Sequence, residues 1–254
     1  MTDDAIADDY ERRIRGAYRN VPAHASGLCG VCSAPTSGPG YELCVPCEGQ
    51  ANSGHRLAHG VIPLSWAPKG AQGYQDLTQY KEPTATTEQI DRLRILLWLA
   101  FTRHADCIIP DRLTRPFAVT HVPSTSGLRG ELHPLEVHLL SMIATARPRA
   151  TPTYVGPIGG DRNSRRTLSP DHWQIDPQTL ARAQRGLILD DRWVTGSHAQ
   201  SIAAAFEAMG VAARIVVLGR ALDGTRTDHG NYLTANPSEP FDSNICPVHG
   251  IRHD

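Results

Sequence analysis

The sequence predicts an α/β fold with a mainly parallel sheet, preceded by a small metal-binding module. Two apolar runs, Leu187–Leu189 and Ile215–Leu218, flank a helix-periodic stretch, which is the pattern of a β-α-β unit. A third apolar run, Phe117–Pro123, precedes another helical stretch at about 134–146. Two Cys-x-x-Cys pairs lie ahead of this alternating region.

The length of 254 residues and the average apolar content indicate one main domain with a small accessory part. We expect an N-terminal helix and tail at 1–25, a four-cysteine module at 26–50, the α/β domain at 51–220 and an irregular tail at 221–254. The net charge of −1 argues against a general nucleic-acid coat protein. The acidic start and the lack of a long apolar run predict a cytoplasmic protein without a membrane span.

The N-terminal half contains two predicted helices. Tyr10, Ile14 and Tyr18 indicate a short helix within residues 1–20, whereas residues 51–85 have no clear period. Thr86 and Gln89 form a capping-box pattern ahead of the clearest helix, 87–104. Its apolar stripe consists of Ile90, Leu93, Leu97, Ala100 and Phe101.

Further elements are expected in the C-terminal half. Residues 152–155 read as a strand, and Asp176-Pro177 is a good start for a helix that ends near Gln184. A helix after Gly196 has one apolar face, formed by Ile202, Ala205, Phe206 and Met209.

The two cysteine pairs predict a structural zinc site. Its expected ligands are Cys29, Cys32, Cys44 and Cys47. Four thiolates give a closed tetrahedral site with no open position, and the Pro- and Gly-rich stretch between the pairs suits a return of the chain to the ion. Such a short segment buries little apolar surface, so the metal should supply most of its folding free energy. An iron–sulfur cluster and redox dithiols remain alternatives.

The two remaining cysteines give weaker signals. Cys246 and His249 have ligand-like spacing, but two ligands alone are a weak indication of a metal site. Cys107 follows the predicted helix and leads into apolar residues, so a buried thiol is its expected role.

An acid pair at the end of a strand indicates an anion site. Asp190 and Asp191 follow the apolar run, and Thr195 and Gly196 close the turn before the next helix. A helix N-terminus offers free N–H groups and the positive end of its dipole. Carboxylates beside such a phosphate site suit a sugar phosphate. The alternative is an ordinary turn with surface acids.

This segment resembles the phosphoribosyl-diphosphate loop of type I phosphoribosyltransferases. That loop reads as apolar residues, Asp-Asp, two variable residues, Thr-Thr-Gly, a small residue and Thr. Four residues match it: Asp190, Asp191, Thr195 and Gly196. Val194 and His198 stand where hydroxyl side chains are typical.

The order of parts over residues 27–220 resembles the ComF-like phosphoribosyltransferase proteins of bacteria, in which Cys-x-x-Cys pairs precede a type I phosphoribosyltransferase fold. Tyr80-Lys81 and Val122-Pro123 look like further features of these proteins. The resemblance implies a sheet of the type I phosphoribosyltransferase type with a zinc-ribbon-like module.

The resemblance also implies transfer of a phosphoribosyl group from phosphoribosyl diphosphate, bound with magnesium, to a base or an amine. Asp190 and Asp191 would be catalytic and contact the ribose hydroxyls directly or through magnesium-bound water. The residues expected to hold the 5-phosphate are Thr195, Gly196, Ser197 and His198. Those expected to hold the diphosphate or close over it are Ser124, Thr125, Arg129, Arg162 and Arg165.

A non-catalytic protein is the alternative hypothesis. ComF-like proteins are associated with DNA uptake, so a module that senses a nucleotide, or binds single-stranded DNA or a protein partner, is the second function we derive from the resemblance. A stable α/β protein with a zinc staple and an unrelated partner is the third. The sequence leaves the acceptor and the oligomeric state open.

Overall fold

The computed structural model describes residues 3–38, 40–58, 60–110, 116–123, 133–140, 143, 150–152, 155–157, 167–237 and 239–253. Its helices are α1 (Asp3–Ile14), α2 (Val45–Ala51), α3 (Gln72–Gln79), α4 (Thr87–Ile108), η1 (Glu136–Leu140), η3 (Pro170–His172), α6 (Pro177–Leu180), α7 (Ser197–Ala208) and α8 (Thr227–Ala235). Its strands are β1 (Val61–Pro63), β2 (Trp66–Pro68), β3 (Phe117–His121), β4 (Ala150–Pro152), β5 (Val155–Pro157), β6 (Trp173–Ile175), β7 (Arg185–Trp193) and β8 (Ala212–Leu222).

The main sheet is parallel and has the order β1-β8-β7-β3-β4, with β2 pairing with β8 beyond the end of β1. Strands β5 and β6 form a separate antiparallel pair. The expected α/β class with a mainly parallel sheet is therefore confirmed. No helix in the described ranges combines the length and hydropathy needed to cross a bilayer.

The predicted β-α-β unit is formed by β7, α7 and β8. Gly186 of β7 pairs with Ala213 of β8, and the ring of Phe206 on α7 lies over this point. A Cβ atom at Gly186 would stand 2.5 Å from that ring, so the missing side chain lets α7 pack closely on the sheet.

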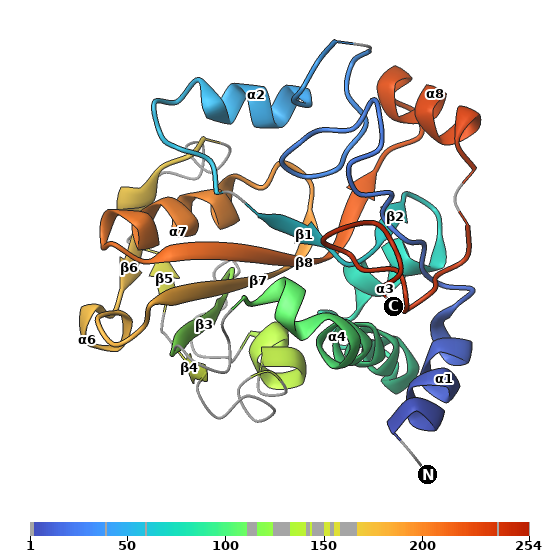
Figure 1. Cartoon of the computed structure of the whole chain (residues 1–254), viewed down its shortest axis with the longest axis horizontal. Coiled ribbons are helices and arrows are strands. Elements are labelled where there is room, and N and C mark those ends of the chain that lie inside the picture. The colour runs from blue at the N-terminus through green and yellow to red at the C-terminus, as the bar shows by residue number, and fades with distance from the viewer. Residues whose placement is uncertain are drawn as a thin grey trace.

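Helices cover both faces of the sheet (Figure 1), with α1 and α4 below it and α2 and α7 above it. Leu187 and Leu189 belong to the core on the α4 face, whereas Ile188 belongs to the core on the α7 face. This alternation is the period of two expected of a strand that is buried on both sides.

Helix α4 begins as predicted, since the Thr86 hydroxyl accepts from the backbone of Gln89 and the Gln89 side chain accepts from the backbone of Thr86. It runs on to Ile108, past the expected end, through a non-helical residue at His104. Helix α1 is also present as expected.

Other elements differ from the predictions. Residues 51–85, which lack a period, form β1, β2 and α3, and the tail expected to be irregular contains α8. The helix after Asp176 is shorter than expected. Asp176 accepts a hydrogen bond from the backbone N–H of Gln178, as an N-cap does, but the helix ends at Leu180 after one turn. Met209 caps the end of α7 and is 41% exposed, so it does not share the buried face.

Two predicted elements are only partly described. The strand expected at 152–155 overlaps the end of β4 and the start of β5, which belong to different sheets, and residues 153–154 lie outside the described part. The helix expected at 134–146 is described as the π-helical turn η1, and residues 141–142 and 144–146 lie outside the described part.

Candidate functional site

The acid pair lies on β7 just past the end of the neighbouring strand. His121, the last residue of β3, pairs with Leu189, so Asp190 and Asp191 extend beyond β3 while Asp190 still pairs with Val217 of β8. Both acids are nearly buried, at 8% and 7% exposure. The carboxyl edge of the sheet therefore presents two adjacent carboxylates in an environment of low polarity.

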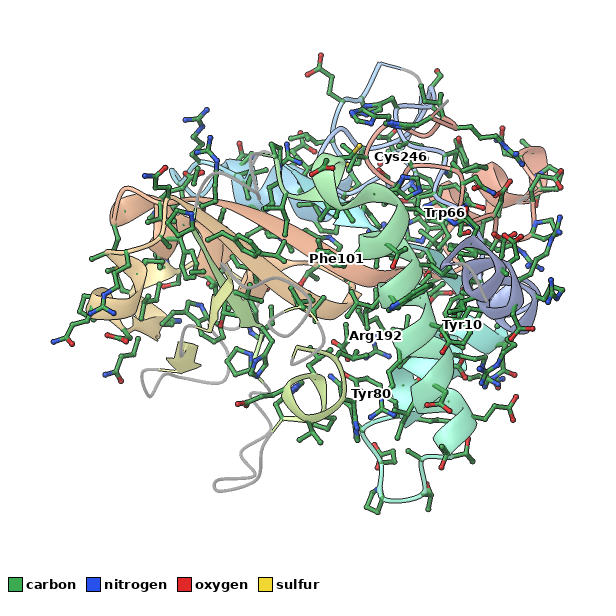
Figure 2. All side chains as sticks on the ribbon, turned by 60° about the horizontal axis from the view of Figure 1, so that its bottom comes forward. Tyr10, Trp66, Tyr80, Phe101, Arg192 and Cys246 are labelled. Atoms are coloured by element: carbon green, nitrogen blue, oxygen red, sulfur yellow. The ribbon has the colours of Figure 1, made fainter. Side chains whose placement is uncertain are left out.

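Asp191 has two partners from the turn between α3 and α4. Its Oδ2 accepts a 3.1 Å hydrogen bond from the Tyr80 hydroxyl and lies 2.5 Å from Lys81 Nζ. The Arg192 guanidinium lies over the Tyr74 ring of α3 at 5.5 Å. Figure 2 labels Tyr80 and Arg192 beside α4, on the same side of the sheet. Asp191, which the sequence predicts as a site residue, therefore contacts the ammonium group of Lys81 and the phenol of Tyr80.

The carboxyl group of Asp190 has a strongly shifted pKa. Burial and then the charge of Asp191 raise the pKa of Asp190 to about 8, although Lys81 opposes the shift. Burial, followed by the charge of Asp191, also raises the pKa of Tyr80 well above its ordinary value. At neutral pH Asp190 is therefore mostly protonated, and Lys81 balances the charge of Asp191.

Two histidines stack close to this group. The rings of His121 and His133 lie 5.0 Å apart with an interplanar angle of 29°. Burial lowers the pKa of each to about 4, and the charge of Lys81 contributes to both shifts. Both imidazoles are therefore neutral at pH 7, when they offer hydrogen bonds without adding positive charge.

These histidines and Lys81 are not among the site residues predicted from sequence. His121 reads as a core residue because it sits in an apolar strand, yet it is only half-buried. Its position at the end of β3 is the signal that would have placed it, since strand ends in a parallel sheet meet at one edge.

A tight turn connects the acids to α7, and we call residues 194–198 the anion loop. Gly196 has φ 77° and is the N-cap of α7. The buried Trp193 ring packs against it so closely that a Cβ atom would lie 2.0 Å away. Only glycine meets both conditions at this position.

The expected phosphate ligands come together at the start of α7. The Thr195 and Ser197 hydroxyl oxygens lie 3.3 Å apart, and the His198 ring meets Trp173 edge-on at 5.5 Å. Val194 is 53% exposed and brings no hydroxyl to the loop. The four-residue set 195–198 thus surrounds a helix N-terminus, where backbone N–H groups and the dipole favour an anion.

Arg220 supports this loop from beneath and was not predicted. It is 2% exposed, and its Nη1 donates to the carbonyl oxygens of Trp193 at 2.7 Å and Val194 at 3.3 Å. A buried cation below the loop adds positive potential where an anion would bind. Its place in an apolar strand gives no sequence signal for this role.

The cysteine module contacts the same loop. Gln50, at the end of α2, donates a 2.5 Å hydrogen bond from Nε2 to the carbonyl oxygen of Thr195. Beyond the module, the backbone N–H of Ala58 donates to Gln200 Oε1 of α7 at 2.8 Å. The module therefore contacts the anion loop, and the chain that follows the module contacts α7.

The predicted metal ligands lie close together. All four sulfurs, those of Cys29, Cys32, Cys44 and Cys47, are buried and lie within 4.8 Å of one another. Cys32 Sγ is 3.6 Å from Cys44 Sγ and 3.6 Å from Cys47 Sγ. A tetrahedral zinc ion with Zn–S bonds of about 2.3 Å requires sulfurs roughly 3.8 Å apart. The cluster is thus positioned to hold a single metal ion.

The four sulfurs lie so close together that they shift one another's pKa. Contact with Cys29 raises the pKa of Cys32, whereas contacts with the other two sulfurs and the charge of Arg220 lower it below its ordinary value. Contacts with the sulfurs of Cys29 and then Cys32 raise the pKa of Cys47. Four thiolates together therefore need a positive ion to balance them.

Five predicted site residues lie outside the described part of the chain. These are Ser124, Thr125, Arg129, Arg162 and Arg165. The expected strand before them is present, and β3 leads into Val122 and Pro123.

No protein-family model matches the sequence, and no curated protein matches it at a significant level.

Proposed function

We propose that the protein binds phosphoribosyl diphosphate with magnesium at the carboxyl edge of β7 and transfers the phosphoribosyl group to a base or an amine. The observation that carries this proposal is the adjacency of the acid pair on β7 to the anion loop at the N-terminus of α7. A ligand that needs both groups has hydroxyls at one end and a phosphate at the other.

The anion loop would hold the 5-phosphate. The donors at this end of the helix are the backbone N–H groups at the start of α7, the Thr195 and Ser197 hydroxyls and the His198 ring. The buried charge of Arg220 strengthens the site without contacting the phosphate, since its Nη1 is engaged with main-chain carbonyls.

The acid pair would contact the ribose hydroxyls. In this structure Asp191 forms an ion pair with Lys81 and accepts a hydrogen bond from Tyr80. Lys81 is 36% exposed, and an arriving diphosphate would compete with Asp191 for it. This exchange frees one carboxylate for the ribose and moves a cation onto the leaving group.

Magnesium fits the donor set, because it prefers oxygen ligands and is commonly held by one or two carboxylates together with phosphate oxygens. Asp190 and Asp191 are the carboxylates that would hold it, directly or through water. When bound, magnesium would neutralise charge on the departing diphosphate. Catalysis would otherwise rest on positioning and electrostatic stabilisation by residues around the ligand.

The metal module has a structural part in this proposal. Zinc suits the four-thiolate cluster, because such closed sites stabilise small modules without taking part in chemistry. Through Gln50 the module holds the main chain of the anion loop in place.

Calorimetric titration with magnesium and phosphoribosyl diphosphate tests this function. We expect saturable binding to the zinc-replete protein and none to the variant with Asp190→Asn and Asp191→Asn. The matched control is Asp8→Asn with Asp9→Asn, a second pair of adjacent acids, which is exposed on α1. Equal binding by the wild type and the Asp190/Asp191 variant would refute the proposed site.

Transfer itself is measured as release of diphosphate in the presence of purine, pyrimidine and amine acceptors. Release that depends on one acceptor and is lost in the Asp190/Asp191 variant supports the reaction. Tight binding without release for any of them would leave a sensor of the ligand and overturn the transferase part of the proposal.

A further inference from the structure

The C-terminal segment repeats the backbone geometry of the four-cysteine module. In the module the N–H of Cys29 donates to the carbonyl of Ala34 at 2.7 Å, and in the tail the N–H of Cys246 donates to the carbonyl of Ile251 at 2.8 Å. Each bond spans five residues and starts from the first cysteine of its motif. The same loop is therefore closed in the same way at both places.

The match extends through the rest of the loop. Ser33 N–H donates to the Cys29 carbonyl at 2.9 Å, and Gly250 N–H donates to the Cys246 carbonyl at 2.8 Å. Ser33 and Gly250 each directly follow the second ligand position, and their φ values are 53° and 71°. We call this turn a knuckle; its backbone geometry brings the side chains of its two ligand positions close together.

Flanking residues pair alike as well. Antiparallel bridges join Leu28 to Pro35 in the module and Ile245 to Arg252 in the tail, one residue outside each closing hydrogen bond. The second ligand position is Cys32 in the first knuckle and His249 in the second. Both residue types bind zinc through an atom that this turn can present.

Two more ligands complete the set beside the tail knuckle. Cys107 comes from the end of α4, and His253 lies four residues after His249. The ligand atoms of Cys107, Cys246, His249 and His253 all lie within 4.8 Å of one another. Figure 2 labels Cys246 next to the C-terminal end of α4.

The spacing of the ligand atoms suits a tetrahedral ion. Cys246 Sγ lies 3.4 Å from His249 Nδ1, and His249 Nδ1 lies 3.1 Å from His253 Nε2. Cys107 Sγ lies 3.9 Å from the other ring nitrogen of His253, Nδ1. Zinc with bonds of about 2.0–2.3 Å keeps its ligand atoms roughly 3.3–3.8 Å apart. No side chain has to travel far to enclose an ion.

We propose that Cys107, Cys246, His249 and His253 form a second zinc site, which clasps the C-terminal segment to the end of α4. Two cysteines and two histidines are a common set of ligands in structural zinc sites, and four protein ligands leave no open position. This site is independent of the proposed transferase function, because it lies on other elements and shares no residue with the acid pair or the anion loop.

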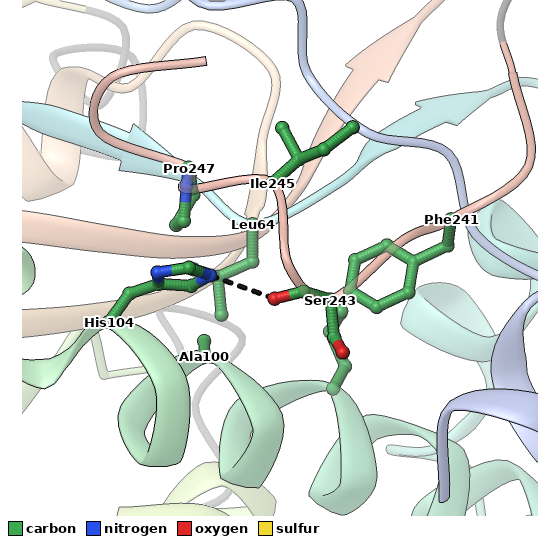
Figure 3. A pocket seen from close by; sticks show the side chains of 8 residues that line it. Leu64, Ala100, His104, Phe241, Ser243, Ile245 and Pro247 are labelled. Atoms are coloured by element: carbon green, nitrogen blue, oxygen red, sulfur yellow. Dashed lines mark hydrogen bonds between the residues drawn. The ribbon is translucent and has the colours of Figure 1, made fainter. Parts of the chain in front are cut away.

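The clasp has a clear mechanical role. Phe241, Ser243 and Pro247 lie against α4 around a small pocket, and His104 Nε2 is 2.8 Å from the Ser243 carbonyl oxygen (Figure 3). The tail also reaches the chain just before the first module, since His24 Nε2 is 3.0 Å from the carbonyl oxygen of Val248. A metal at its end would hold these contacts together.

Zinc content after metal loading and removal of loosely bound ions tests the site. We expect two zinc ions per wild-type chain and one in the variant with His249→Ala and His253→Ala. Both histidines are exposed, so their removal leaves the core intact. The control His55→Ala removes an exposed histidine outside both clusters and should keep two ions.

Cobalt substitution provides a second measurement that does not depend on zinc stoichiometry. In the double histidine variant, the thiolate-to-cobalt absorption should be that of a four-thiolate site alone. The difference spectrum, wild type minus variant, should be that of a site with two thiolates. One zinc ion per wild-type chain would overturn the proposal. So would two ions and an unchanged cobalt spectrum in the double histidine variant.

Discussion

Gln50 Nε2 donates a 2.5 Å hydrogen bond to the carbonyl oxygen of Thr195, which joins the cysteine module to the anion loop. The two residues are far apart in sequence, and the contact places α2 directly behind the turn that leads into α7. The module is therefore more than a separate folding unit, because its position is coupled to the geometry of the proposed phosphate site.

Gln50→Ala should weaken ligand binding without removing the metal. Loss of one buried hydrogen bond costs about 0.5–1.5 kcal/mol, which corresponds to roughly a 2- to 12-fold rise in Kd if the whole cost falls on the bound state. Calorimetry and zinc content measure the two effects separately. Gln178→Ala, at an exposed position on α6, is the control. Unchanged affinity in Gln50→Ala would show that the loop holds its shape without the module.

Arg220→Met should destabilise the protein and weaken anion binding. The substitution leaves the Trp193 carbonyl without its 2.7 Å donor and removes a buried charge from below the loop. Loss of such a buried partner costs about 1–3 kcal/mol. Chemical denaturation measures the stability, and Arg182→Met, at an exposed position, controls for the loss of one charge. Equal stability of the two variants would contradict this role.

Gly196→Ala should cost more stability than Gly210→Ala. Both glycines have positive φ, at 77° and 78°, so both variants share a backbone strain of about 1 kcal/mol. Only at Gly196 does the new Cβ meet the Trp193 ring, at 2.0 Å, whereas nothing lies within 4 Å at Gly210. Overpacking adds about 1–3 kcal/mol. Thermal denaturation measures the stability of both variants. Equal melting temperatures for Gly196→Ala and Gly210→Ala would contradict the close packing of Trp193 on Gly196.

The contribution of Asp190 to the stability of the protein should fall as pH rises from about 4 to about 8. Burial raises the pKa of Asp190 from 3.8 to about 8, so the folded state holds a proton that the unfolded chain releases. The stability that this proton contributes is fully present below the unfolded pKa and is lost by the time pH passes the folded pKa. Between the two pKa values the free energy of unfolding falls by up to about 1.4 kcal/mol per pH unit.

Asp190→Asn removes this titration, so the difference in stability between the variant and the wild type should grow in favour of the variant between pH 5 and pH 8. Denaturation at several pH values checks the trend, with Asp8→Asn as the exposed control. A difference that stays constant over this window would show that Asp190 is ionised in the folded protein.

Local patterns predicted the α/β class and the cluster of four cysteines. The capping box of Thr86 and Gln89 depends on neighbouring residues, and so does the Cys-x-x-Cys spacing, which is why both could be read from the sequence. The β-α-β unit could be read for the same reason, because the apolar period changes at Gly196.

The parts that were missed depend on contacts between distant residues. Arg220 reaches the loop from the next strand, and Lys81 reaches Asp191 across the sheet edge. Cys107 lies 146 residues from His253 in sequence but 3.9 Å from it in space. No local pattern reports such distances, so the tail was expected to be irregular and Cys107 to be a buried thiol.

A crystal structure of the zinc-replete protein with magnesium and phosphoribosyl diphosphate tests the proposed site most directly. We predict that the 5-phosphate lies against the N–H groups of Thr195 to His198 and that the ribose hydroxyls contact Asp190 and Asp191. Lys81 should have left Asp191 for the diphosphate. A ligand bound elsewhere, with Lys81 still paired to Asp191, would contradict the proposed function.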